Sequence, residues 1–105
     1  MQLTTRGRRT EKPHSVIVSF VYEDGYVYLL AGVPRDWHEN IKKNPNVTLR
    51  IEDKVIHGVA EPFLNEEKAL AEIKSKFKRK YSLNYYVQWY EHMDRRPVRI
   101  KLLKI

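Results

Sequence analysis

The residues best suited to binding chemistry lie between positions 4 and 15, where four cationic side chains and several hydroxyl groups surround one glycine. Arginine offers paired, planar N–H donors, threonine and serine add neutral donors, and the backbone at Gly7 can approach an anion closely. This combination predicts a site that surrounds a phosphate or a carboxylate. A basic arm that is only hydrated by solvent is the alternative interpretation.

Other kinds of reactive site find little support in the sequence. It has no cysteine, and its four histidines, His14, His38, His57 and His92, stand in different predicted elements without a close pair. Because a metal ion needs several ligands at recognised spacings, we expect no metal site. The sequence also lacks nucleophile-elbow, zinc-protease and glycine-rich phosphate or dinucleotide motifs. Hydrolytic chemistry is therefore not expected, and the catalytic residues stay unassigned.

An aromatic segment near the carboxyl end is a second feature that could act on a ligand. Its rings could wall a cofactor or an aromatic acceptor, and a tyrosine hydroxyl could donate a hydrogen bond to a developing anion. Packing in the core or in a dimer interface is the alternative interpretation. The segment falls within residues 81–93 and contains Tyr81, Tyr85, Tyr86, Trp89 and Tyr90.

The elements that must position these residues are mostly strands. Alternating apolar and polar residues predict one strand over 13–22 and a second over 26–31, joined by a turn at Gly25. Two further β-rich runs, 47–51 and 54–63, predict a second hairpin. A last alternating run, from Pro97 to Ile105, predicts a closing strand.

Three helices are predicted between these strands. Asp36, with Glu39 as its capping-box partner, begins a short helix that reaches Asn44. Asn65 caps a longer helix that ends near Lys80, and the aromatic segment follows as a third helix. The order of elements predicts a mainly β fold, a small antiparallel barrel with accessory helices, in a single domain over residues 1–105.

Composition narrows the class of partner. Twenty Lys and Arg residues against thirteen Asp and Glu give a net charge of +7, which favours anionic partners.

The lack of cysteine and of any long apolar segment or signal-peptide core indicates a cytoplasmic protein with no membrane span. Because a domain of 105 residues has a modest core, we expect a homodimer.

Three segments together resemble a known family. Residues 3–13, the strand end at 28–32 and the short helix with its flank at 36–47 occur in the order and spacing of the deazaflavin-dependent nitroreductases. That family lies within the FMN-binding split-barrel group, which includes pyridoxamine 5′-phosphate oxidase. The resemblance covers residues 3–62. It implies a six-stranded antiparallel split barrel, usually dimeric, that holds FMN or the deazaflavin coenzyme F-420. It also implies hydride transfer to a small quinone- or nitro-type acceptor.

The resemblance also implies which residues bind the cofactor. The cations of the basic segment would hold its phosphate or acidic tail, supported by a serine at the start of the next strand. A glycine at the strand end would allow close approach, and two residues of the short helix would line the pocket. These residues are Arg8, Arg9, Lys12, Ser15, Gly32, Trp37 and Asn40.

Two other classes of function stay open at this point. A nucleic-acid-binding barrel could use the basic run at 74–80 to contact phosphates, although a lysine-rich helix end is usually a solvated face. A noncatalytic flavin-binding protein would keep the phosphate site without turnover. An oxidoreductase is favoured because a flavin or deazaflavin ring carries the hydride itself, so the protein needs no visible acid or base.

Overall fold

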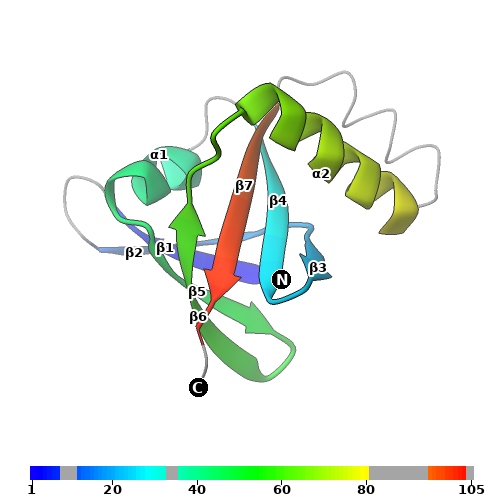
Figure 1. Cartoon of the computed structure of the whole chain (residues 1–105). Helices are drawn as coiled ribbons and strands as arrows, with labels where there is room; N and C mark the ends of the chain where they lie inside the picture. Colours follow the sequence, from blue (N-terminus) through cyan, green and yellow to red (C-terminus); the bar gives the residue numbers. More distant parts are fainter. Residues whose placement is uncertain (8–11, 33–35, 81–94, 104–105) are drawn as a thin grey trace.

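The computed structural model describes residues 1–7, 12–32, 36–80 and 95–103 (Figure 1). In these ranges the chain is mainly β, as the sequence predicts. The elements are β1 (Gln2–Arg6), β2 (Pro13–Ile17), β3 (Val21–Glu23), β4 (Tyr26–Gly32), α1 (Asp36–Lys43), β5 (Asn46–Ile51), β6 (Lys54–Glu61), α2 (Glu66–Lys80) and β7 (Arg95–Leu102).

All of these strands form one sheet in the order β2-β1-β5-β6-β7-β4-β3, and each neighbouring pair is antiparallel. β7 comes last along the chain but lies between β6 and β4. Its register with β4 runs from Arg95 opposite Gly32 to Lys101 opposite Tyr26. Figure 1 shows β7 and β4 side by side in the middle of the curled sheet. The predicted antiparallel barrel is confirmed.

The strand predicted over 13–22 is wrong in one respect, because it is two strands at opposite edges of the sheet. Residues 18–20 cross from β2 to β3, and the amide of Val18 donates to the carbonyl of Met1 at 3.0 Å. The alternation of side chains continues through this crossing, so the pattern gave no sign of the break. β1 was also missed as a strand, since only Leu3 and Thr5 of its five residues face inward. The barrel therefore has seven described strands rather than six.

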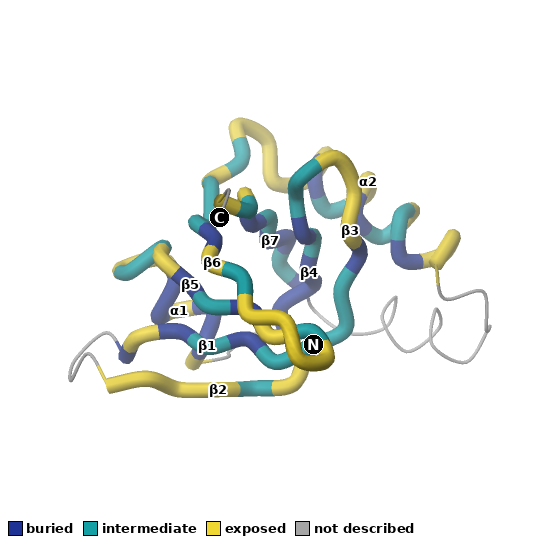
Figure 2. The backbone as a smooth tube through the Cα atoms, turned by 90° about the horizontal axis from the view of Figure 1, so that it is seen from below, coloured by how far each residue is buried: buried dark blue, intermediate teal, exposed yellow. Residues whose placement is uncertain are grey.

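The main core fills the inside of the curled sheet and is closed on one side by α1. Each fully buried aliphatic side chain contributes about 1.5 to 3 kcal/mol to folding. Figure 2 shows the buried residues along β1, β5, β7 and β4, while β2 is exposed along one edge. The core consists of Leu3, Val27, Leu29, Ala31, Trp37, Ile41, Val47, Leu49, Val98 and Ile100.

The second core lies beneath α2, which packs on β3, β4 and β7. Ile73 and Phe77 of the helix meet Val21 and Leu30 of the sheet. The helical spacing of Ala69, Leu70, Ile73 and Phe77 in the sequence predicts this apolar stripe, and the structure confirms it, with Leu70 at its partly buried margin. Neither helix that the structure describes is long and apolar enough to cross a membrane.

The ends of these elements also follow the predictions. Asp24 and Gly25 both have positive φ angles, 51° and 83°, as a tight two-residue hairpin turn requires. Asn65 caps α2, because its Oδ1 accepts a hydrogen bond from the amide of Lys68 at 3.1 Å. The third predicted helix, over 85–93, lies outside the described residues.

Candidate functional site

The predicted anion-binding segment forms the connection between β1 and β2. Arg6 pairs with Pro13 at the end of this ladder, and the amide of Gly7 donates to the carbonyl of Lys12 at 2.8 Å. The side chains of Arg6 and Lys12 are exposed at the base of the loop. Arg8 and Arg9 lie outside the described residues. The hairpin thus brings two cations of the segment to one end of β1 and β2.

Ser15 lies on the outer face of the same hairpin. Its Oγ is 2.8 Å from Oγ1 of Thr4, directly across the β1–β2 ladder. Thr4 faces Thr48 on β5, whose Oγ1 is 3.4 Å from Nδ1 of His57 on β6. A row of three hydroxyls and one imidazole therefore crosses four strands. Sequence analysis missed this row, because the four residues come together only through the strand register.

Gly32 occupies the last position of β4, where it is buried and faces Arg95 of β7. The guanidinium of Arg95 is also buried, and one of its terminal nitrogens donates to the carbonyl of Leu30 at 3.4 Å. A buried cation therefore stands beside the predicted glycine. The sequence did not single out Arg95 because it lies far away along the chain.

The two predicted residues of α1 point into the protein. Trp37 belongs to the main core. Asn40 is 2% exposed, and its Nδ2 donates to Oγ1 of Thr5 on β1 at 3.3 Å. This bond ties the helix to the strand that leads into the basic loop. The structure thus links Asn40 to the anion-binding segment through β1, and a direct contact of either residue with a cofactor stays a prediction.

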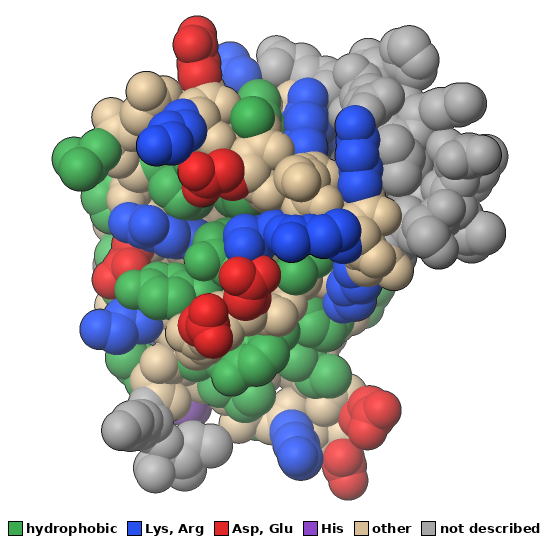
Figure 3. Space-filling model, turned by 45° about the vertical axis from the view of Figure 1, so that its right-hand side comes forward, with side chains coloured by type: hydrophobic (Ala, Val, Ile, Leu, Met, Phe, Trp, Pro, Cys, Tyr) green, Lys and Arg blue, Asp and Glu red, His purple; other side chains and the backbone are tan. Residues whose placement is uncertain are grey.

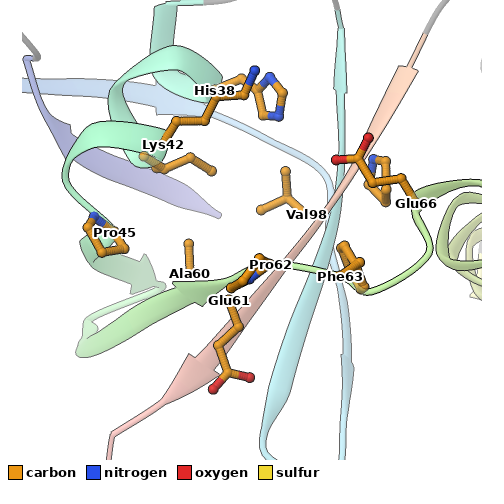
Figure 4. A pocket seen from close by; sticks show the side chains of 11 residues that line it. His38, Lys42, Pro45, Ala60, Glu61, Pro62, Phe63, Glu66 and Val98 are labelled. Carbon is orange, nitrogen blue, oxygen red and sulfur yellow. The ribbon is translucent and has the colours of Figure 1, made fainter.

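A cleft of about 450 Å3 opens on another side of α1 (Figure 4). We call it the α1–α2 cleft, since it lies between α1, the end of β6, the start of α2 and the start of β7. His38 and Lys42 reach it from α1, while Phe63 and Glu66 stand on the other side. Sequence analysis did not find it. The lining residues are His38, Ile41, Lys42, Pro45, Ala60, Glu61, Pro62, Phe63, Glu66, Pro97 and Val98.

His38 is the buried titratable group of this cleft, with 7% of its surface exposed. Burial lowers the pKa of His38 below its ordinary value of 6.5, and the nearby charge of Lys42 lowers it further. Glu39 and Glu66 oppose this change, while Arg96 of β7 adds to it. The imidazole is therefore neutral at pH 7, and it can donate one hydrogen bond and accept another. Within the described ranges, no group of three His, Asp or Glu side chains could hold a metal ion.

The basic end of α2 is engaged with the sheet. Lys76 Nζ lies 2.8 Å from Oε2 of Glu23, which lowers the pKa of that carboxyl, and 5.2 Å from the ring centre of Tyr28. Lys80 donates to the carbonyl of Phe20 and lies over its ring. Figure 3 shows acidic side chains interspersed among the basic ones on this face. The described basic side chains at this end of α2 therefore do not form a continuous phosphate-binding stripe.

Comparison with known proteins agrees with the family suggested by the sequence. The model of the F420H(2)-dependent quinone reductase family matches residues 1–102. Among curated proteins, no sequence matches the chain.

Solved structures with the same fold include a reductase, an oxidase and a heme storage protein. An F420-H2-dependent reductase, FDR-A, superposes with a TM-score of 0.70 at 24% identity, over 95% of this chain and 91% of that one. A putative pyridoxamine 5′-phosphate oxidase from Listeria innocua gives 0.69 at 18%, over 98% and 82%. HutZ, a heme storage protein from Vibrio cholerae, gives 0.76 at 14%, over 99% and 81%. At these identities the likeness shows the fold, which is the split barrel.

The buried bond between Asn40 and Thr5 can be tested by a double-mutant cycle. We expect Asn40→Ala and Thr5→Val each to lower the free energy of unfolding by about 1 to 3 kcal/mol, because each removes the buried hydrogen bond between the two side chains. The double variant should lose less than the sum of the two, by about 0.5 to 1.5 kcal/mol. Urea unfolding measures all three variants.

Thr4→Val is the matched control, since Thr4 lies next to Thr5 but faces the outside of the sheet. We expect it to change the free energy of unfolding by less than about 0.5 kcal/mol. Strict additivity of the Asn40 and Thr5 variants would show that the two side chains do not interact.

The buried state of His38 predicts how stability depends on pH. Because the folded protein holds the pKa of this group below 6.5, the unfolded chain binds more protons near that pH. The contribution of neutral His38 is therefore complete above pH 6.5 and is lost as the pH falls below it. We expect the wild type to lose more stability than His38→Gln between about pH 7.5 and about pH 5. Parallel pH profiles of the two proteins would contradict the burial of His38.

Proposed function

The chain belongs to the F420H(2)-dependent quinone reductase family, and from this premise we propose that it transfers a hydride from a reduced deazaflavin to a small quinone-type acceptor. Its class is that of the deazaflavin-dependent oxidoreductases, with a deazaflavin or FMN as the cofactor. The choice of acceptor and the preference for the deazaflavin are the parts that we propose. We also propose that residues 1–105 act as one cytoplasmic split-barrel domain.

The observation that carries this proposal is the basic hairpin loop between β1 and β2. Its ends are held together by the Gly7–Lys12 backbone bond, and the exposed Arg6 and Lys12 stand at its base. Such a set of donors fits a phosphate and the carboxylates of an acidic cofactor tail, because guanidinium and ammonium groups form strong charge-assisted hydrogen bonds with both. Arg8, Arg9 and Lys12 would hold this anionic part.

The rest of the predicted site is suited to orienting a ring and excluding water. Gly32 offers a backbone position without a side chain beside the buried Arg95. Trp37 supplies an apolar surface, and Asn40 fixes α1 against Thr5. Ser15, paired with Thr4, supports the start of β2. When bound, the reduced ring supplies the hydride, so these residues need only bind and orient the two reactants.

Removal of the loop cations tests the proposal directly. Each charge-assisted hydrogen bond that is lost should weaken cofactor binding by about 1.5 to 3 kcal/mol. We therefore expect the Arg8→Ala/Arg9→Ala variant to bind the deazaflavin at least about tenfold more weakly than the wild type, with an unchanged melting temperature. Fluorescence titration measures binding. Loss of the reduced deazaflavin in the presence of menadione, a naphthoquinone, measures hydride transfer.

Lys78→Ala/Arg79→Ala is the matched control, because it removes the same charge from the exposed end of α2. Equal weakening in both variants would mean that only net charge matters. Absence of menadione reduction by the wild type, with the deazaflavin bound, would refute the proposed reaction while leaving the binding site in place.

The edges of the sheet lead us to propose a homodimer. β2 and β3 are its two edge strands, and on β2 the side chain of Ile17 is 79% exposed. An exposed apolar edge strand is a template for pairing with another chain. We expect sedimentation at tens of micromolar to show two chains per particle.

Replacing the exposed Ile17 with a charged residue tests whether the β2 edge forms the dimer contact. Ile17→Lys should shift the protein toward the monomer. Leu64→Lys, at an exposed apolar residue between β6 and α2, should have no effect. A wild type that sediments only as a monomer would exclude the dimer.

A further inference from the structure

The α1–α2 cleft is separate from the described residues that we assign to the cofactor. The ones that the structure describes are Lys12, Ser15, Gly32, Trp37 and Asn40, and none of them lines the cleft. Its volume of about 450 Å3 lies within the range of small-molecule sites. The cleft therefore needs an explanation of its own.

His38 is the lining side chain of this cleft that can both donate and accept a hydrogen bond. More than nine tenths of the residue is buried, yet no hydrogen bond to its imidazole is found among residues 1–7, 12–32, 36–80 and 95–103. Its ring nitrogens are not among the buried polar atoms that lack a partner, so they keep access to the cleft that the ring lines. A molecule bound there could therefore form a hydrogen bond with the imidazole.

The walls of the cleft favour a flat, apolar ligand. Phe63 and Val98 face the space, and the other apolar lining residues are Ile41, Pro45, Ala60, Pro62 and Pro97. Buried apolar surface with a few polar groups is the usual composition of a site for a small organic molecule. An aromatic ring would cover these side chains and displace water from them.

The charged side chains around the cleft include two ion pairs and one further carboxylate. Lys42 Nζ lies 3.5 Å from Oε1 of Glu39, and Nε of Arg99 lies 3.7 Å from Oε1 of Glu61. Glu66 adds a second carboxylate to the lining. An anionic ligand would meet two carboxylates and one ammonium group that already has a partner, so a neutral ligand is favoured.

We propose that the α1–α2 cleft is a second ligand site, which binds a neutral aromatic alcohol or ketone through a hydrogen bond to His38. The ring of the ligand packs against Phe63 and Val98, and its oxygen meets the imidazole. Because neutral imidazole has one donor and one acceptor nitrogen, it can pair with either a hydroxyl or a carbonyl group. The proposal goes beyond the deazaflavin reaction and does not depend on it.

The test uses 2-naphthol as the probe, the full-length protein and no deazaflavin, at pH 7.5. Calorimetry should show one saturable site. We expect His38→Phe to weaken the affinity for 2-naphthol by about fivefold, through loss of one hydrogen bond. Phe63→Ala should also weaken this affinity, whereas His57→Ala should not. His57 is exposed on β6 outside the cleft, so its variant is the matched control and should bind as the wild type does.

Two further measurements keep the proposal testable if a variant does not fold. In the wild type, NMR should show that 2-naphthol shifts the imidazole protons of His38 more than those of His57. 2-Naphthoate, with the same ring and a negative charge, should bind at least fivefold more weakly. No saturable binding, shifts confined to other histidines, stronger binding of 2-naphthoate or unchanged binding in the folded His38 and Phe63 variants would each overturn the proposal. These measurements contain no deazaflavin, so they test the cleft without testing hydride transfer, and menadione reduction tests that reaction separately.

Discussion

The fold depends on the position of β7, which is the last strand in sequence and lies near the middle of the sheet. On one side it pairs with β6, and on the other its residues from Arg95 to Lys101 pair with β4. Without it, β2-β1-β5-β6 and β4-β3 would be two separate small sheets, and two-stranded sheets are marginally stable in water. Val98 and Ile100 also contribute to the main core, so the same strand joins the two halves and fills the space between them.

A short covalent connection also joins the two halves. Residues 18–20 connect the two edge strands, β2 and β3, so the ladder at one end of the sheet cannot move far from the ladder at the other. β2 also carries the basic loop, and β4 ends at Gly32. The two parts of the predicted cofactor site are therefore on segments whose relative position is fixed by the sheet, and α1 adds the Asn40–Thr5 bond to this framework.

Local signals in the sequence were sufficient for most elements. The Asp24–Gly25 turn, the Asn65 cap and the stripe of Ile73 and Phe77 are each determined by neighbouring residues, and each is found where it was predicted. The break at 18–20 was not predictable in this way, because it depends on which strands pair, and alternation continues through it. The same reason hid the Ser15–Thr4–Thr48–His57 row and the meeting of Gly32 with Arg95, which are set by register alone.

The α1–α2 cleft shows most clearly what a sequence pattern cannot convey. His38 follows Trp37 directly, but successive residues of a helix point about 100° apart, so one ring enters the core and the other lines the cleft. The two rings remain in edge-on contact, with centres 6.1 Å apart. A helix of eight residues cannot move one of its faces without the other. The position of His38 in the cleft is therefore set by the same short helix that places Trp37 in the core and Asn40 against Thr5.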